Sequence, residues 1–175
     1  MIRLEKFERS DFQQLIEWIN SEALLINWCG FLFRFPLSAE SLEWYIEGSN
    51  NLETSDAFIY KAIDEETGLS IGHISLGSIS RKNKSARISR VLVGNTSEHK
   101  KGTCRQMANE ILKIGFGPLQ LHRISLGVYD DNIAAIKCYE KSGFVTEGII
   151  RDVLLYNGTY RSMIEMSILD NEWKG

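Results

Sequence analysis

Along much of the chain, hydrophobic and polar residues alternate with the period of two that is typical of a strand with one buried face. The alternation is clear near the end, where Ile164, Met166 and Ile168 are separated by single residues. Segments with this pattern, or with an apolar run of strand length, lie between turn-forming residues. They predict strands at residues 2–7, 56–64, 68–80, 86–93, 122–129, about 144–156 and 160–169.

Other segments have the spacing of three and four residues that indicates the apolar stripe of a helix. One such stripe contains Cys104, Met107, Ile111 and Ile114. An aromatic-rich loop, "NWCGFLFRFPL", is expected between the first two helices. The pattern predicts helices at residues 11–20, 38–48, about 104–114 and 132–143.

The order of these elements is β-α-α-β-β-β-α-β-α-β-β. It predicts an α/β fold with a mixed, mostly antiparallel central sheet flanked by helices, and it excludes a β-sandwich or a helical bundle. No repeat, low-complexity tract or Pro/Gly/Ser-rich linker interrupts the chain. We therefore expect one domain over residues 1–175.

Composition narrows the class of protein. The 175 residues are 43% hydrophobic and 25% charged, which is typical of a globular chain and not of a disordered one. The formal net charge of −3 gives no general reason to expect nucleic acid or an anionic membrane as a partner. The start, "MIRLEKFERSDF", has no apolar signal core, and no apolar run approaches the ~20 residues that cross a bilayer. A cytoplasmic enzyme or binding module is expected.

The three cysteines, Cys29, Cys104 and Cys138, are far apart. With the three histidines they form none of the close-spaced patterns that hold zinc, so we expect no metal site. Buried free thiols are the expected state of these cysteines.

A first candidate site is the stretch "EHKKGTCRQM" at residues 98–107, between an expected strand and an expected helix. Backbone N–H groups at a helix start bind anions, and Gly102 leaves room for a ligand to approach. Lys100, Lys101 and Arg105 add positive charge. The alternative is an ordinary solvated helix start, which the motif alone does not exclude.

A second candidate is "GVYDDNIAAIKCYEKSGF" at residues 127–144. Asn132, Ala135 and Tyr139 fall at i, i+3 and i+7 and share one helix face, where an elongated ligand could lie. The alternative is that Asn132 only caps the helix and Tyr139 only packs.

The pattern V-x-x-x-N-x-x-A-I-x-x-Y-E-K-x-G-F, from Val128 to Phe144, resembles the acetyl-CoA motif of the GNAT superfamily of N-acetyltransferases. The segments "LHRISLGV", "EGIIRD" and "NGTYRSMIEMSIL" are similar to its ribosomal-protein alanine N-acetyltransferase branch. The resemblance implies acetyl-CoA as cosubstrate and an amine as acceptor. It maps the pyrophosphate loop of the family onto His99, Lys100, Lys101, Gly102, Thr103 and Cys104.

The resemblance also assigns roles in a direct acetyl transfer from thioester to amine. Backbone N–H groups at Val91, Leu92 and Val93 would hold the thioester carbonyl. Tyr139 would be the general acid for the departing thiolate. Asn132 would orient the pantetheine arm, with Lys141 near the charged end of the cofactor.

The base that removes the proton of the amine is not evident. The expected strand at 86–93 has no acidic residue, and Glu98 and His73 are the remaining candidates. Freeing a lysine-like amine at pH 7 costs about 4–5 kcal/mol, whereas an α-amino group costs only about 1 kcal/mol. An α-amine of a peptide or small molecule is therefore the easier acceptor, and Arg34 in the aromatic-rich loop could bind its carboxylate or phosphate.

Two alternatives stay open at this point. A catalytically silent module of the same fold could bind CoA or a partner. A nucleic-acid-binding α/β domain would depend on the short basic turn that contains Arg81, Lys82 and Lys84. The sequence does not fix the oligomeric state, and a homodimer is kept as an option.

Overall fold

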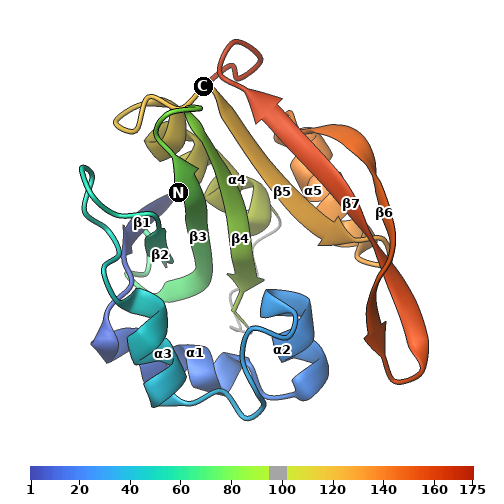
Figure 1. The fold of residues 1–175 in the computed structure, drawn as a ribbon. Helices are drawn as coiled ribbons and strands as arrows, with labels where there is room; N and C mark the ends of the chain where they lie inside the picture. Colours follow the sequence, from blue (N-terminus) through green and yellow to red (C-terminus); the bar gives the residue numbers. More distant parts are fainter. Residues whose placement is uncertain (95–101) are drawn as a thin grey trace.

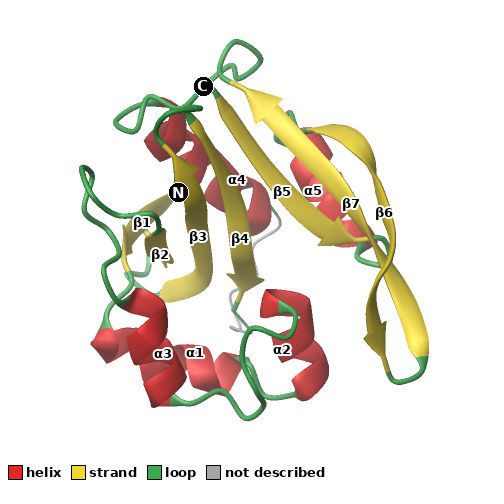
Figure 2. Ribbon diagram, viewed as in Figure 1, coloured by secondary structure: helices red, strands yellow, loops and turns green. Residues whose placement is uncertain are grey.

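The computed structural model describes residues 1–94 and 102–175, and within them one sheet carries helices on both faces (Figures 1 and 2). The elements share the order expected from the sequence, with one additional α-helix and a short 3-10 helix. They are β1 (Ile2–Lys6), η1 (Arg9–Asp11), α1 (Phe12–Trp18), α2 (Glu22–Cys29), α3 (Ala39–Ile46), β2 (Phe58–Asp64), β3 (Ser70–Ser80), β4 (Ser85–Val93), α4 (Thr103–Phe116), β5 (Arg123–Tyr129), α5 (Ile133–Lys141), β6 (Val145–Tyr156) and β7 (Thr159–Leu169).

The sheet has seven strands among the described residues, in the order β1-β2-β3-β4-β5-β7-β6. All neighbours are antiparallel except β4 and β5, which are parallel. The expected mixed, mostly antiparallel α/β class is therefore confirmed. Among the described residues, β4 and β5 pair only where Ser85–Arg87 lie beside Arg123–Ser125. Beyond these residues the two strands diverge (Figure 1).

Helix α2 occupies part of the segment that the sequence predicted as an aromatic loop. Its start has clear local causes: Ser21 is extended, and its hydroxyl accepts a hydrogen bond from the Leu24 N–H at 3.3 Å. Glu22 adds a negative charge to the first turn, where the helix dipole favours it. No described helix is long and apolar enough to cross a membrane.

Strand β4 contains a β-bulge at Arg90 and Val91. His73 of β3 pairs with Leu92, but Ser75 pairs with Ser89, so two β4 residues lie opposite the single β3 residue between them. Arg90 has a φ of +53°, in the left-handed region. Because a bulge shifts the alternation by one residue, it changes which side chains face each layer.

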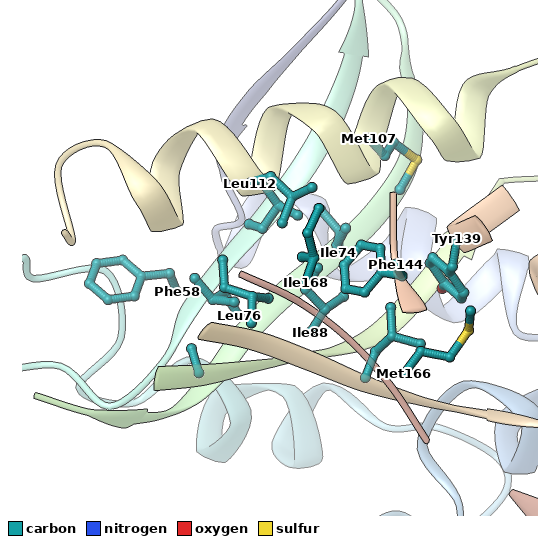
Figure 3. Close-up of a cluster of buried hydrophobic side chains, with 14 of the residues drawn as sticks. Phe58, Ile74, Leu76, Ile88, Met107, Leu112, Tyr139, Phe144, Met166 and Ile168 are labelled. Atoms are coloured by element: carbon teal, nitrogen blue, oxygen red, sulfur yellow. The ribbon is translucent and has the colours of Figure 1, made fainter. Parts of the chain in front are cut away.

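The core consists of one hydrophobic cluster on each face of the sheet. On the α4–α5 face, Ile88 of β4 packs with Met107, Leu112, Tyr139 and others (Figure 3). On the α1–α3 face, Leu92 of β4 packs with the second cluster. Even-numbered side chains of β4 thus switch faces across the bulge.

Candidate active site

A cavity of about 540 Å³ lies where β4 and β5 diverge. Its walls come from β4 and β5, from α2 at one side, and from α5 and the start of α4 at the other. The cavity brings together seven residues that the sequence nominated: Val91, Leu92, Val93, Cys104, Asn132, Ala135 and Tyr139.

The other nominated residues lie elsewhere. Arg105 and Lys141 are exposed and are not among the residues that line the cavity, and Thr103 is buried in the first turn of α4. His99, Lys100 and Lys101 lie outside the described residues. The charge expected of those three side chains therefore stays a prediction.

The β4 edge of the cavity is formed by backbone. After Arg87, no residue of β4 pairs with β5. Since β4 also pairs with β3 at Leu92 and Val93, the backbone groups of Val91–Val93 that point away from β3 have no partner in a described strand, and these three residues line the cavity. Such N–H groups are suited to hold a carbonyl oxygen, which is the role expected for this segment from the sequence.

Helix α4 starts at Gly102, the position expected at the centre of the phosphate loop. Gly102 is the N-cap with a φ of +94°, a conformation that side chains oppose. No atom of the described residues lies within 4 Å of the position that a Cβ would take there. A 14-residue helix directs its first N–H groups and its positive dipole end to this point. The start of α4 is therefore a place where an anionic group can bind.

Tyr139 of α5 belongs to the hydrophobic cluster on the α4–α5 face of the sheet and also lines the cavity. Only 6% of it is exposed, and its ring packs edge-on against Phe144, with centroids 5.8 Å apart (Figure 3). Burial raises the pKa of Tyr139 to about 12, so the phenol is protonated at neutral pH. It can donate a proton or a hydrogen bond into the cavity.

Asn132 is the N-cap of α5. Its side-chain carbonyl oxygen accepts a hydrogen bond from the Ala135 N–H at 3.2 Å. The capping role considered for this residue is therefore real, and it orients the side chain at the cavity wall. The amide NH₂ group of Asn132 forms no hydrogen bond with another described residue, so it is available to a ligand.

The prediction of free thiols is wrong for two of the three cysteines. Cys104 and Cys138 form a disulfide. Their separation of 34 residues gave no signal in the sequence; they meet because α4 and α5 pack side by side on one face of the sheet. Cys29 is free, and burial raises the pKa of its thiol. Among the residues that the structure describes, no group of three or more side chains is arranged to hold a metal.

Of the aromatic residues in the segment predicted as an aromatic-rich loop, Trp28 lines the cavity and the three phenylalanines do not. Trp28 and Phe33 are buried, whereas Phe31 and Phe35 are exposed. Arg34, which was predicted to bind a carboxylate or phosphate of the acceptor, is exposed and does not line the cavity. Arg90 does line the cavity. It belongs to the strand that was noted in the sequence because it contains no acidic residue.

His73, one of two candidate bases, is 1% exposed and does not line the cavity. Its Nε2 is 3.1 Å from the Tyr45 hydroxyl. Desolvation, followed by the positive charge of Arg90, lowers the pKa of His73 to about 3. These surroundings are those of a buried structural histidine. The other candidate, Glu98, lies outside the described residues.

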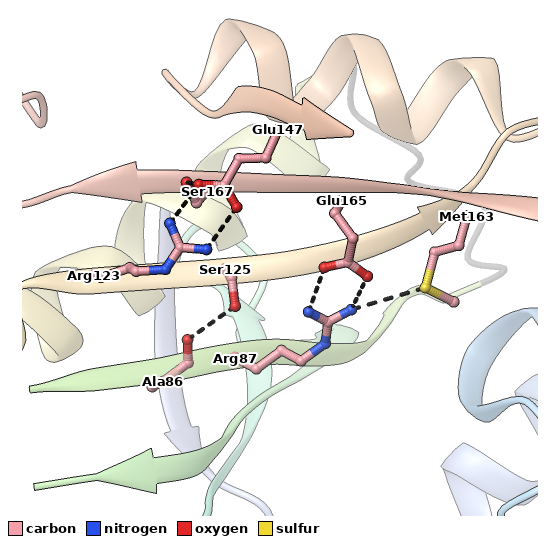
Figure 4. A network of polar contacts seen from close by, with 8 residues as sticks. All are labelled: Ala86, Arg87, Arg123, Ser125, Glu147, Met163, Glu165 and Ser167. Carbon is pink, nitrogen blue, oxygen red and sulfur yellow. Dashed lines mark hydrogen bonds and ion pairs between the residues drawn. The ribbon is translucent and has the colours of Figure 1, made fainter. Parts of the chain in front are cut away.

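An ion-pair network that sequence reasoning missed joins the strands beside the cavity (Figure 4). Arg87 of β4 donates two hydrogen bonds of 2.7 Å to Glu165 of β7, across β5. Arg123 of β5 donates two of 2.6 Å to Glu147 of β6. The network holds four strands in register at the closed end of the divergence. Arginines and glutamates in strands were its only sequence signal.

Comparisons with known proteins agree with this geometry. The family model described as "Acetyltransferase (GNAT) domain" matches residues 2–145. The chain is 27% identical over 173 residues to a spermidine N(1)-acetyltransferase of Vibrio cholerae, covering 98% of this chain and 95% of the relative. It is 26% identical over 175 residues to the putative ribosomal N-acetyltransferase YdaF of Bacillus subtilis, covering 99% and 94%.

A solved structure has the same fold. The spermidine N-acetyltransferase of Vibrio cholerae in complex with CoA and spermine superposes with a TM-score of 0.82, at 24% identity, over 98% of this chain and 96% of the other. All three of these relatives are named as acetyltransferases, so the alternative of a silent module finds no support. The ribosomal branch suggested by the sequence is represented by one of them and is not singled out.

Proposed function

The chain belongs to the acetyltransferase (GNAT) family, and from this premise we propose that it moves the acetyl group of acetyl-CoA to a primary amine by direct attack on the thioester. The observation that carries the proposal is the cavity between β4 and β5. It places an open backbone edge, a helix start and a protonated tyrosine around one space.

Acetyl-CoA supplies an acetyl group already activated as a thioester. The N–H groups of β4 at Val91–Val93 stabilise negative charge on the thioester oxygen as the amine attacks, and they need no rearrangement to do so. Tyr139 donates a proton to the departing sulfur, since its phenol is neutral at the pH of the reaction.

The remaining nominated residues position the long cosubstrate. Gly102 and the first turn of α4 bind its phosphates through backbone N–H groups. Lys100, Lys101, Arg105 and Lys141 contribute charge around them, and Asn132 orients the pantetheine arm from the wall of α5.

The acceptor in this proposal is an amine that is partly neutral at physiological pH. No described acidic residue lines the cavity to act as base. An amine of low pKa, such as an α-amino group, then costs less to deprotonate, by about 3–4 kcal/mol relative to a lysine-like amine. One relative is named for spermidine and another is named as a putative ribosomal N-acetyltransferase, so the proposal includes both small-molecule amines and protein amines as acceptors.

A homodimer is part of the proposal. Strand β6 is the edge of the sheet and exposes the apolar side chains of Val145, Ile149, Ile150 and Val153. An exposed apolar edge strand invites pairing with another chain. Sedimentation that gives a monomer at micromolar concentration would contradict this part alone.

The test of the function is release of the CoA thiol. Acetyl-CoA is incubated with the protein and with α-amino peptides, polyamines, amino acids and amino sugars in turn. Acetylation of at least one class, confirmed by mass of the product, is expected. Thiol release with none of them, in a protein that CoA stabilises against heat, would overturn the proposal.

A further inference from the structure

Arg90 lies at the bulge of β4, beside the proposed reacting centre, and it lines the cavity. Its guanidinium carbon is 4.9 Å from the centroid of the Tyr45 ring. One Nη donates to the Ser89 hydroxyl at 3.0 Å, and its Nε is buried with no hydrogen-bond partner among the described residues. The guanidinium thus lies between the cavity, which Arg90 lines, and the Tyr45 ring of α3.

The charge of Arg90 is unbalanced, in contrast to its neighbours. Arg87 is neutralised by Glu165, and Arg161 by Asp131. Arg90 forms no ion pair with any carboxylate in the described part of the chain. None of the described residues that line the cavity is Asp or Glu, so a net positive charge remains at the acceptor side.

The backbone holds Arg90 in this place. The indole N–H of Trp28 donates to the carbonyl oxygen of Arg90 at 2.9 Å. This bond ties α2 to the bulge and fixes the residue from which the side chain extends. The guanidinium is therefore presented by a rigid element, as a group that determines specificity requires.

We propose that Arg90 binds a carboxylate of the acceptor, and that the substrate is a primary amine that carries a carboxylate. This inference rests on the proposed acetyl transfer and names its substrate class. A carboxylate offers two oxygens to the donors of a guanidinium. A polyamine would bring several positive charges to a cavity that has an unpaired arginine and no described acid.

The first test uses the unmodified protein and matched amines. Alanine is compared with alaninamide, and the peptide Ala-Glu-Ala-amide with Ala-Gln-Ala-amide, with spermidine as the polycation. One of the two pairs will resemble the natural acceptor more closely. In that pair, the compound with the carboxylate is expected to have a kcat/KM at least about tenfold higher than the compound with the amide. The first pair reports on free amino acids and the second on acidic peptides.

The second test compares two arginine variants. Arg90→Gln is expected to raise KM for the preferred acid at least about tenfold and to abolish the preference over the amide. Arg34→Gln, the matched control on an exposed arginine outside the cavity, is expected to change neither. CoA affinity measured by calorimetry should be the same in both variants.

The outcomes separate the two proposals. Spermidine turnover equal to or above that of every acid, or acids and amides used equally well, would overturn the role of Arg90 and leave the acetyl transfer standing. Loss of thiol release with all five amines and with the wider amine panel would count against the transfer itself. The comparison on the unmodified protein decides the inference even where Arg90→Gln fails to fold.

Discussion

Cys104 in the first turn of α4 and Cys138 in α5 are joined by a disulfide, with their Cα atoms 6.4 Å apart. The bond connects the helix start suited to phosphates with the helix that carries Tyr139. Two parts of the proposed cosubstrate site are therefore held together covalently, on the same side of the cavity.

Loss of this bond is expected to lower stability. Cys138→Ser opens a loop closed over a sequence separation of 34 residues, which the chain-entropy model values at about 3–4 kcal/mol in the free energy of unfolding. Urea unfolding with and without a dithiol reductant measures it. The reductant should destabilise the original protein and leave Cys138→Ser unchanged. Cys29→Ser, at the free cysteine, should respond to the reductant like the original protein.

Tyr139→Phe is expected to lower kcat more than it lowers affinity for CoA. The phenol that donates to the leaving sulfur is lost, which costs roughly 10²–10⁴-fold in rate for a general acid, while the ring stays in the core. Steady-state kinetics and calorimetry with CoA measure the two effects. Tyr60→Phe removes a hydroxyl from β2, outside the cavity, and should leave kcat unchanged. Equal losses of rate and CoA affinity would mark Tyr139 as structural.

Gly102→Ala isolates the backbone conformation at the start of α4. A Cβ there meets no atom of the described part of the chain within 4 Å, so the expected cost of the substitution is the strain of a positive φ, about 1–2 kcal/mol. Gly68→Ala, with a φ of +71° and equally open space, is the matched control. Both variants should lose similar stability to urea, but only Gly102→Ala should bind CoA more weakly. Equal CoA affinity in both would argue against phosphate binding at α4.

Gly127→Ala should disturb the ion pair at the base of the cavity. A Cβ at Gly127 would collide with Nη2 of Arg87 and Sδ of Met163 and would lie 3.0 Å from Oε1 of Glu165. Overpacking of this kind costs about 1–3 kcal/mol. Gly148→Ala in β6, where nothing lies within 4 Å, should be close to neutral. Thermal unfolding of the two variants checks the difference, and equal melting temperatures would show that the strands yield easily.

Because His73 is buried, we expect the free energy of unfolding to decrease as the pH is lowered below neutral. Its pKa is about 3 in the folded protein and 6.5 when unfolded, so the unfolded chain binds the extra proton between these values. The contribution of His73 to the free energy of unfolding is complete above pH 6.5. It is lost as the pH falls, by about 2 kcal/mol between pH 6.5 and 5.

His73→Gln removes this titration. Urea unfolding at several pH values should show the variant losing less stability than the original protein as the pH falls. Identical slopes in the original protein and His73→Gln would contradict the lowered pKa.

The elements that repeat local patterns were predictable, and those that depend on distant partners were not. The alternation in β7 and the stripe of α4 follow from local periodicity, so both were placed within a few residues. Helix α2 was missed because its start depends on the Ser21 cap and its last three residues begin the segment that was predicted as an aromatic-rich loop. The disulfide and the Arg87–Glu165 pair join segments far apart in sequence, and no local signal reveals them.

The candidate site divides in the same way. Tyr139, Asn132 and Gly102 belong to local motifs and were named in advance. Arg90 became prominent only through the bulge, which turns one residue of β4 out of its normal alternation. A bulge is a mismatch between two strands, and a single strand does not encode it visibly.

Among the described residues, three residue pairs connect β4 to β5, all at one end of the two strands. Hydrogen-bonding groups along the open part of β4 are left for a ligand that lies between the strands. Such a ligand would take the place of a missing strand segment and bridge the two parts of the sheet. Protection of β4 amides from hydrogen exchange should therefore rise together with that of β5 when CoA binds.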